Sequence, residues 1–438
     1  MFVLNAISLI RIARPVAHTE KSLRKEMFQR NLHLAIMNVQ QSLASYNVST
    51  GKDALETPRG RTAHEFFRKY FLDGQILEDG AKERKENIST DATFDEILLI
   101  KYRKFIAFLI PFFVAQTVWW LTAWKFDFFS LYPTHWHMPV TMILGATVAG
   151  MTSEGGGAVA FPVMTFILHI DPTTARDFSL MIQSVAMTLS LFVIIFMQIQ
   201  IEWRAIVLAT VGAVPGVIVG FTWLDPFFTG PQKKMMFVSC WCAFAISLWI
   251  LNRQKKRTTY SKIPHFCMWK AVVLVATGFV GGILNSMAGS GVDICTFSVI
   301  TLLFRISEKT ATPTTVVLMG INSIIAVYWR AVMMGNIAQL AWDYVKVTVP
   351  VSVTFAPFGS FLGSHFHRLV LAVFIYILEA AALVGFLFTK PAISLLLAGS
   401  LIIVGGFLFF SLLSNIGERL MESIEEEKRE TTSKQPQL

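Results

Sequence analysis

Charged residues are scarce in this sequence. Of its 438 residues only 15% are Asp, Glu, Lys or Arg, whereas 54% are hydrophobic and 13% are aromatic. Several apolar stretches run for about 20 residues without a charge, which is the length that a helix needs to cross a hydrocarbon core of about 30 Å. The composition therefore excludes a soluble globular protein and predicts an integral membrane protein.

Cysteines are few as well, and the basic residues do not form one patch. The four cysteines have no framework spacing and three of them lie in apolar stretches, which excludes a disulfide scaffold and predicts free thiols. The net charge is +9, but the basic residues lie at the ends of apolar stretches, so they indicate membrane anchors and not a nucleic-acid surface. We expect the lipid bilayer as a partner, no nucleic acid, no cofactor and no metal.

The apolar stretches divide the chain into segments. Uninterrupted spans are expected at about 105–124, 175–198, 205–224, 235–251, 312–330, 341–362, 370–389 and 392–413. Two further stretches, 138–170 and 271–304, are interrupted by glycines. The expected domains are a cytosolic N-terminal arm (1–100), a first span with an external loop (101–137), transmembrane repeat 1 (138–251), a cytosolic basic loop (252–270), transmembrane repeat 2 (271–389), a last span (390–415) and a cytosolic charged tail (416–438).

Each interrupted stretch contains one glycine cluster. The first cluster is Ser153-Glu154-Gly155-Gly156-Gly157 and the second is Gly289-Ser290-Gly291. Glycines break helix geometry, and non-helical backbone inside a membrane must face protein or a water-filled cavity. Because the halves on either side of each cluster are short for a crossing, each stretch is either one long broken span or a hairpin that enters and returns.

The distribution of positive charge favours the hairpins. The loop 252–270 holds six lysines and arginines, and Lys101, Arg103 and Lys104 precede the first span. Both groups lie on the cytoplasmic side only if the first interrupted stretch returns to the side that it entered. Each repeat then has a hairpin and three spans, which is an odd number of crossings, so the second repeat is inverted relative to the first. A proline followed by spaced glycines also recurs, at 215–220 and 357–363, and such spacing lets helices approach closely.

The predicted fold is therefore an all-α membrane protein. It is a polytopic helical bundle with two inverted repeats, each a glycine-broken re-entrant hairpin plus three spans, and both termini are cytoplasmic. Inverted repeats are frequent in secondary transporters, which bind their substrate near the membrane midplane where the copies meet.

The glycine clusters offer an anion site. A half-helix that begins at such a cluster directs backbone N–H groups and the positive end of its dipole toward the loop, and this end binds anions. The alternative is that the glycines only allow tight helix packing. The polar residues of the following spans either line the same cavity or form interhelical hydrogen bonds: Ser179, Gln183, Ser184, Thr314, Thr315, Asn322 and Ser323. The candidate substrate-binding residues are Ser153, Gly155, Gly156, Gly157, Gly289, Ser290, Gly291, Ser184 and Asn322.

Ionisable residues inside apolar stretches are costly and point to function. Glu379 lies near the middle of a span and is a candidate proton carrier, with a purely structural carboxyl as the alternative. Glu154 stands inside the first cluster, where a carboxylate would repel an anion, so it is protonated, turned away or a second proton-coupling residue. Asp293 is expected to cap a helix N-terminus. The pairs Arg176 with Asp177 and Asp343 with Lys346 are expected at the membrane edges.

These residues resemble the sulfite exporter TauE/SafE family of membrane anion transporters. The resemblance rests on 145–162, 278–296, 215–220 and 357–363, and it covers about 138–415. It implies export or uptake of a small sulfur-containing or carboxylate anion such as sulfite or a sulfonate. The sequence departs from the family pattern at Ser153-Glu154, at Ser290 and at Cys295-Thr296, where a proline is expected.

We therefore expect a secondary transporter, and not an enzyme, that holds a small anion between the two glycine-rich half-helix N-termini and couples its movement to protons. One alternative is an intramembrane serine hydrolase with Ser290 as nucleophile and His365 as base. A receptor or scaffold without transport is the other.

Overall fold

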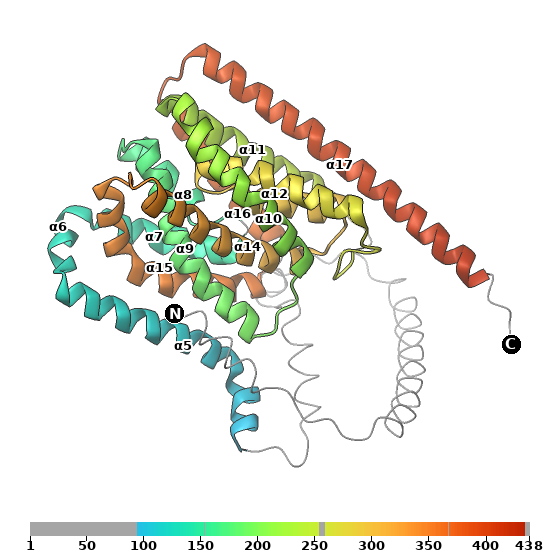
Figure 1. Ribbon diagram of the computed structural model, residues 1–438, viewed down its shortest axis with the longest axis horizontal. Helices are drawn as coiled ribbons and strands as arrows, with labels where there is room; N and C mark the ends of the chain where they lie inside the picture. The colour runs from blue at the N-terminus through green and yellow to red at the C-terminus, as the bar shows by residue number, and fades with distance from the viewer. Residues whose placement is uncertain (1–93, 153, 254–258, 367, 434–438) are drawn as a thin grey trace, which may run out of the picture. The chain divides into compact units, whose positions relative to one another are not determined.

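The computed structural model describes residues 94–152, 154–253, 259–366 and 368–433 (Figure 1). These residues are almost entirely helical, and the β-structure among them is limited to a single isolated bridge between Tyr260 and Ile306. The all-α class is thus confirmed. The predicted arm lies outside the described residues except for its last few, which belong to the first helix.

Two consecutive series of helices make up most of the described chain. The first series is α7 (His137–Met151), α8 (Gly157–Pro162), the π-helical turn η4 (Val163–Ile167), α9 (Pro172–Phe196), α10 (Trp203–Val219) with the turns η5 (Gly220–Leu224) and η6 (Asp225–Phe227), and α11 (Gly230–Arg253). The second series is α12 (Met268–Ala288), α13 (Val292–Ser298), η7 (Val299–Leu303), α14 (Glu308–Tyr328) with η8 (Trp329–Met333), α15 (Gln339–His365) and α16 (Arg368–Phe388). Before them lie α5 (Phe94–Lys125), η3 (Phe128–Leu131) and α6 (Tyr132–His135), and after them α17 (Ile393–Ser433).

Eight helices of the described chain are long and apolar enough to cross a membrane. They lie at Phe105–Lys125, Pro172–Phe196, Trp203–Phe227, Gly230–Arg253, Met268–Ala288, Glu308–Met333, Leu369–Phe388 and Ile393–Ser423. The expectation of short halves holds for α7, α8 and α13 but is wrong for α12, which has 21 residues because it already begins at Met268. The helix α15, expected as a span, has 27 residues but is not among the eight.

Helices of one series pack most closely on helices of the other. The helix α10 lies along α12, and α15 lies along α7, while α9 and α14 pack against each other. Glycines form both contacts: a Cβ at Gly216 of α10 would overlap the backbone of Phe279, and a Cβ at Gly359 of α15 would overlap the backbone of Thr147. The spaced glycines therefore allow the close helix approach that the sequence predicted. They hold α10 against α12 and α15 against α7, and α12 and α7 each belong to a glycine-broken stretch.

The last helix has a different environment. The helix α17 packs against α11 and extends as one continuous helix of 41 residues, beyond the expected end of the last span (Figure 1). Its apolar side chains are mostly exposed, including Leu397 and Leu401. A helix with such a surface is suited to contact with lipid.

Replacing a glycine of the α10–α12 or α7–α15 contact should destabilise the protein. We expect Gly216→Ala and Gly359→Ala to lower the free energy of unfolding by about 1–3 kcal/mol, because the added methyl group has no space. The measurement is thermal unfolding of the purified protein in detergent. Gly405→Ala in α17 is the matched control, since a Cβ there has nothing within 4 Å; it should unfold at the same or a higher temperature, because alanine favours a helix. Equal effects at all three positions would contradict the packing role.

Candidate functional site

The two glycine loops, residues 152–156 and 289–291, meet on one face of α9. A Cβ at Gly157, where the first loop enters α8, would lie 3.2 Å from Gln183 Nε2 and 3.4 Å from Ser179 Oγ. A Cβ at Gly289 of the second loop would lie 3.3 Å from the Cβ of the same Ser179. Since Ser179 and Gln183 are four residues apart, they share a face of α9. This face brings together segments that are about a third of the chain apart.

Glycine is required at one position of each loop. Gly155 has φ +75° and Gly289 has φ +81°, in the left-handed region that residues with a Cβ rarely adopt. Gly289 ends α12 in this conformation and donates its N–H to the carbonyl oxygen of Asn285 at 2.9 Å. The left-handed residue turns the chain back, so that the short helix that follows packs against the helix before it.

The donors of the second loop bind a carboxylate of the chain itself. Ser290 Oγ donates to Asp293 Oδ2 at 2.5 Å, and the Gly291 N–H donates to Asp293 Oδ1 at 2.8 Å. The Asp293 side chain is buried. It therefore caps the N-terminus of α13, as expected, and its carboxylate accepts the donors of the second loop.

The carboxyl group of the first loop has another carboxyl group as its neighbour. Glu154 is fully buried, and no N–H or hydroxyl group of the described residues donates to either of its oxygens. Its carboxyl group lies within hydrogen-bonding reach of that of Glu379, which is buried in α16, and it also interacts electrostatically with Asp293. Two carboxyl groups can hydrogen-bond only when at least one of them holds a proton. The structure thus brings the two proton-coupling candidates together.

Gln183 is the polar side chain of α9 that contacts a loop. Its Oε1 accepts a hydrogen bond from Ser323 Oγ of α14 at 3.2 Å, while its buried Nε2 faces the first loop without an acceptor among the described residues. The neighbouring Ser184 is turned away by one helix step of about 100° and donates to the Met181 carbonyl oxygen in its own helix. The sequence predicts Ser184 as a substrate-binding residue, whereas the side chain that contacts the first loop in the structure is that of Gln183.

The remaining candidates have other surroundings. Asn322 of α14 donates to the Leu318 carbonyl oxygen and to Thr210 Oγ1 of α10, and its Oδ1 is buried without a partner in the described chain. Gly156 packs against α7, where a Cβ would lie 3.2 Å from Met142 Cε. Ser153 lies outside the described residues. Asn322 and Gly156 thus show helix contacts of the kind that the packing interpretation predicts.

Arg176 and Asp177 are buried and have further charged partners. They belong to a network of charged side chains that also contains Asp225, Lys233 and Arg330. The two side chains therefore do not extend to solvent as snorkelling residues do, and their place at a membrane edge stays a prediction. The other pair, Asp343 with Lys346, is partly exposed, with 2.8 Å between its charged atoms.

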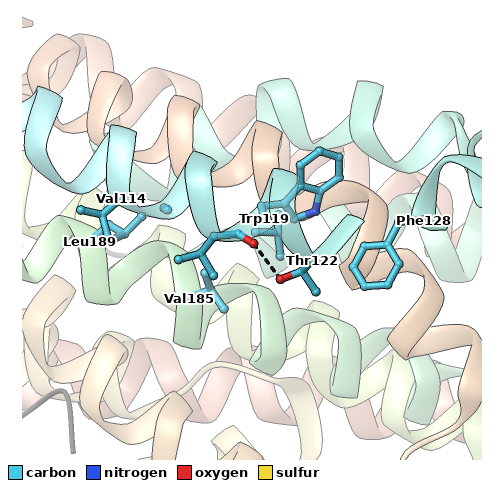
Figure 2. A pocket seen from close by; sticks show the side chains of 9 residues that line it. Val114, Trp119, Thr122, Phe128, Val185 and Leu189 are labelled. Atoms are coloured by element: carbon cyan, nitrogen blue, oxygen red, sulfur yellow. Dashed lines mark hydrogen bonds between the residues drawn. The ribbon is translucent and has the colours of Figure 1, made fainter. Parts of the chain in front are cut away.

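A separate cavity of about 300 Å³ lies between α5 and its neighbours (Figure 2). Its lining is apolar apart from Thr122 and the Trp119 indole, and both are occupied: Thr122 donates to Val118 O at 2.7 Å and Trp119 Nε1 donates to Lys346 O at 2.7 Å. Without a free donor or a cation in its lining, this cavity does not suit an anion.

Eight described helices that can span a membrane define a multi-pass integral membrane protein, and its two glycine loops are buried. The chain belongs to the sulfite exporter TauE/SafE family, whose pattern matches residues 138–386. Members of this family are transporters and not enzymes. The match begins at the start of α7 and ends within α16, so it includes both glycine loops, Glu154 and Glu379. Comparison with curated proteins and with solved structures gave no match.

Asp293 should compete with added anions for the second loop. Asp293→Ala is expected to lower the free energy of unfolding by about 0.5–2 kcal/mol, because a helix loses its cap. Sulfite should then raise the unfolding temperature of this variant more than that of the wild type, because the Ser290 and Gly291 donors are free to bind it. The measurement is thermal unfolding in detergent with and without sulfite.

Asp171→Ala is the control for this prediction. Asp171 caps α9 by accepting the N–H groups of Thr173 at 2.9 Å and Thr174 at 3.4 Å. Its loss should destabilise the protein to a similar extent without any gain in stabilisation by sulfite. If sulfite stabilised both variants equally, Asp293 would be only a structural cap.

Proposed function

We propose that the protein is a secondary transporter that moves a small anion, such as sulfite, an organosulfonate or a related carboxylate, by alternating access around the two glycine loops. The observation that carries this proposal is the meeting of both loops at Ser179. Family membership supports transport of an anion, and the buried, polar surroundings of the loops supply a place for it inside a membrane protein.

The two series of helices act as inverted repeats in this proposal. Each series consists of a glycine-broken hairpin and three further helices. One hairpin enters the membrane from one side, and the other hairpin enters it from the opposite side. The helix packing supports inverted repeats, because α10 of the first series packs on α12 of the second, and α15 of the second series packs on α7 of the first in the equivalent way. Both chain termini then lie in the cytoplasm, together with the basic loop 252–270.

The anion is held between the loops, by the backbone of Gly155–Gly157 and Gly289–Gly291 and by the Gln183 amide. The free Nε2 of Gln183 supports this position, since a buried donor without an acceptor is unfavourable and an oxyanion would satisfy it. Asp293 holds the donors of the second loop while the site is empty. A bound anion would compete with it for them.

Protons travel with the anion in this proposal. Glu154 and Glu379 together carry at least one proton when their carboxyl groups are hydrogen-bonded, because two adjacent carboxylates repel each other. A second proton removes the negative charge of this pair and thereby favours anion binding. Anion and proton are thus expected to move in the same direction.

The hydrolase alternative has weaker support. The hydroxyl of Ser290 donates to Asp293, and no described histidine ring is hydrogen-bonded to either residue. A serine nucleophile needs a general base that takes its proton and returns it to the leaving group, which is commonly a histidine. The hydrogen bond from Ser290 to Asp293 stabilises the second loop.

Glu154 and Glu379 should be required for coupling to a proton gradient. In liposomes that contain the purified protein, sulfite uptake should be faster when the outside is acidic, and Glu379→Gln and Glu154→Gln should abolish this acceleration. Both variants remove the proton site and keep the size of the side chain. Sulfate, thiosulfate, a taurine-like sulfonate and a small carboxylate serve as further substrates in the same assay.

Glu202→Gln is the matched control. Glu202 is also buried, but its carboxylate already accepts the N–H groups of Arg204 at 3.3 Å and Ile263 at 2.9 Å. This variant should lose stability and keep its response to the gradient. A gradient response that survives in Glu154→Gln and Glu379→Gln would refute proton coupling, and the absence of flux for every anion in the wild type would refute the transport proposal.

A further inference from the structure

Five buried charged side chains form one network at the end of the bundle where α9 begins and α14 ends. They come from α9, η6, α11 and η8. The contacts are Arg176 Nη2 to Asp177 Oδ1 at 2.9 Å, Arg176 Nη1 to Asp225 Oδ1 at 2.6 Å, Lys233 Nζ to Asp225 Oδ1 at 2.7 Å and Arg330 Nη2 to Asp177 Oδ2 at 2.6 Å. Both series of helices contribute, because Arg330 follows α14 and the others belong to the first series.

The network has an excess of positive charge. It contains three cations and two carboxylates, so one positive charge is left without an opposite charge within it. The adjacent Lys234 does not alter this balance, because it is offset by Asp171, with which it interacts electrostatically. Unbalanced charge is unfavourable in a buried site and in a membrane protein points to function. An anion that enters the network would remove the excess.

The network extends from near the surface to the second glycine loop. The side chains of Asp225 and Lys233 are 12% and 8% exposed, whereas that of Arg176 is 0% exposed. At the inner end, Arg176 Cγ would lie 3.4 Å from a Cβ at Gly289. An anion that reaches Arg176 is therefore next to the loops at which we place the transport site.

Arg330 retains hydrogen-bonding capacity. Its Nε and Nη2 donate to Asp177 at 3.1 and 2.6 Å, but the acceptor of Nη1 is the thioether sulfur of Met334 at 3.7 Å, which is a weak acceptor. Phe221 holds both guanidinium groups in place, with Arg176 4.9 Å and Arg330 5.5 Å from the centre of its ring. A planar guanidinium held in this way can bind two oxygens of an oxyanion at once.

We propose that this network is a relay site that binds the transported anion before it reaches the glycine loops, with the anion displacing the Asp177 carboxylate from Arg330. The proposal rests on the anion transport proposed above and adds a second binding site to it. The excess charge attracts the anion, and Asp177 keeps the site closed when no anion is present.

Charge variants distinguish a relay site from a purely structural network. Lys233→Gln removes the excess charge and should raise the KM for sulfite in proteoliposomes about tenfold, the effect of one unit charge roughly 10 Å away at an effective dielectric constant of about 20. Asp177→Asn increases the excess and should lower the KM by a similar factor. If Asp177→Asn does not fold, Asp225→Asn makes the same change in charge at the partly exposed end.

A structural network gives a different pattern. If the network only stabilises the fold, both variants lower the unfolding temperature and the KM either stays constant or rises in both, and this outcome would overturn the relay site while wild-type uptake of sulfite sustains the transport proposal. Lys346→Gln is the control, since Lys346 belongs to a neutral and partly exposed pair, and its KM should equal that of the wild type. If the wild type took up none of the anions, both proposals would be refuted.

Discussion

The direct contact between helix backbones is the constraint on which the rest of the structure depends. The helices α10 and α12 touch through Gly216 and its neighbours, and α15 and α7 touch through Gly359. Each contact fixes a glycine-broken stretch of one series against a long helix of the other. The loops that follow α7 and α12 are therefore positioned by both series at once, and a movement of one series relative to the other changes the surroundings of both loops. Such a linkage is what alternating access requires.

The most unusual feature of the proposed anion site is its number of carboxyl groups. Glu154 interacts with both Asp293 and Glu379, and no basic side chain of the described residues contributes to the electrostatic surroundings of Glu154 or Glu379. Negative charge on all three would exclude an anion. Protons on the Glu154–Glu379 pair would reconcile the acidic residues with an anionic substrate, which is the electrostatic reason for the proton coupling proposed above.

Much of the fold follows from local sequence properties. The apolar stretches locate most of the helices, and Gly155 and Gly289 mark both loops, because glycine adopts a left-handed backbone more readily than residues with a Cβ. The spaced glycines at 215–220 and 357–363 likewise predict close helix contacts. The start of α12 at Met268 was missed, since the charged Lys270 separates Met268 and Trp269 from the apolar stretch and the helix includes all three.

The contacts of the site depend on distant residues and are not visible in the sequence. Glu154 and Glu379 were each recognised as unusual, but nothing in the chain indicates that α16 carries one to the other. Arg176 and Asp177 looked like an edge pair because the apolar stretch begins beside them, while Asp225, Lys233 and Arg330 are 48 or more positions away in the chain. Gln183 and Ser184 are both polar and adjacent, and only the helix rotation set by packing against α14 shows which one contacts the loop.

The two glycine loops are similar in backbone conformation, but the carboxyl groups at the two loops have different hydrogen-bond partners. In the second loop the carboxylate of Asp293 accepts hydrogen bonds from a hydroxyl and an N–H group. In the first loop Glu154 accepts neither from any described residue and interacts with the carboxyl groups of Glu379 and Asp293. Hydrogen bonds to a carboxylate stabilise its charged form, and a buried carboxyl group without donors lacks this stabilisation. This difference agrees with the proposal that the first loop carries the proton, while the second loop lies next to Arg176.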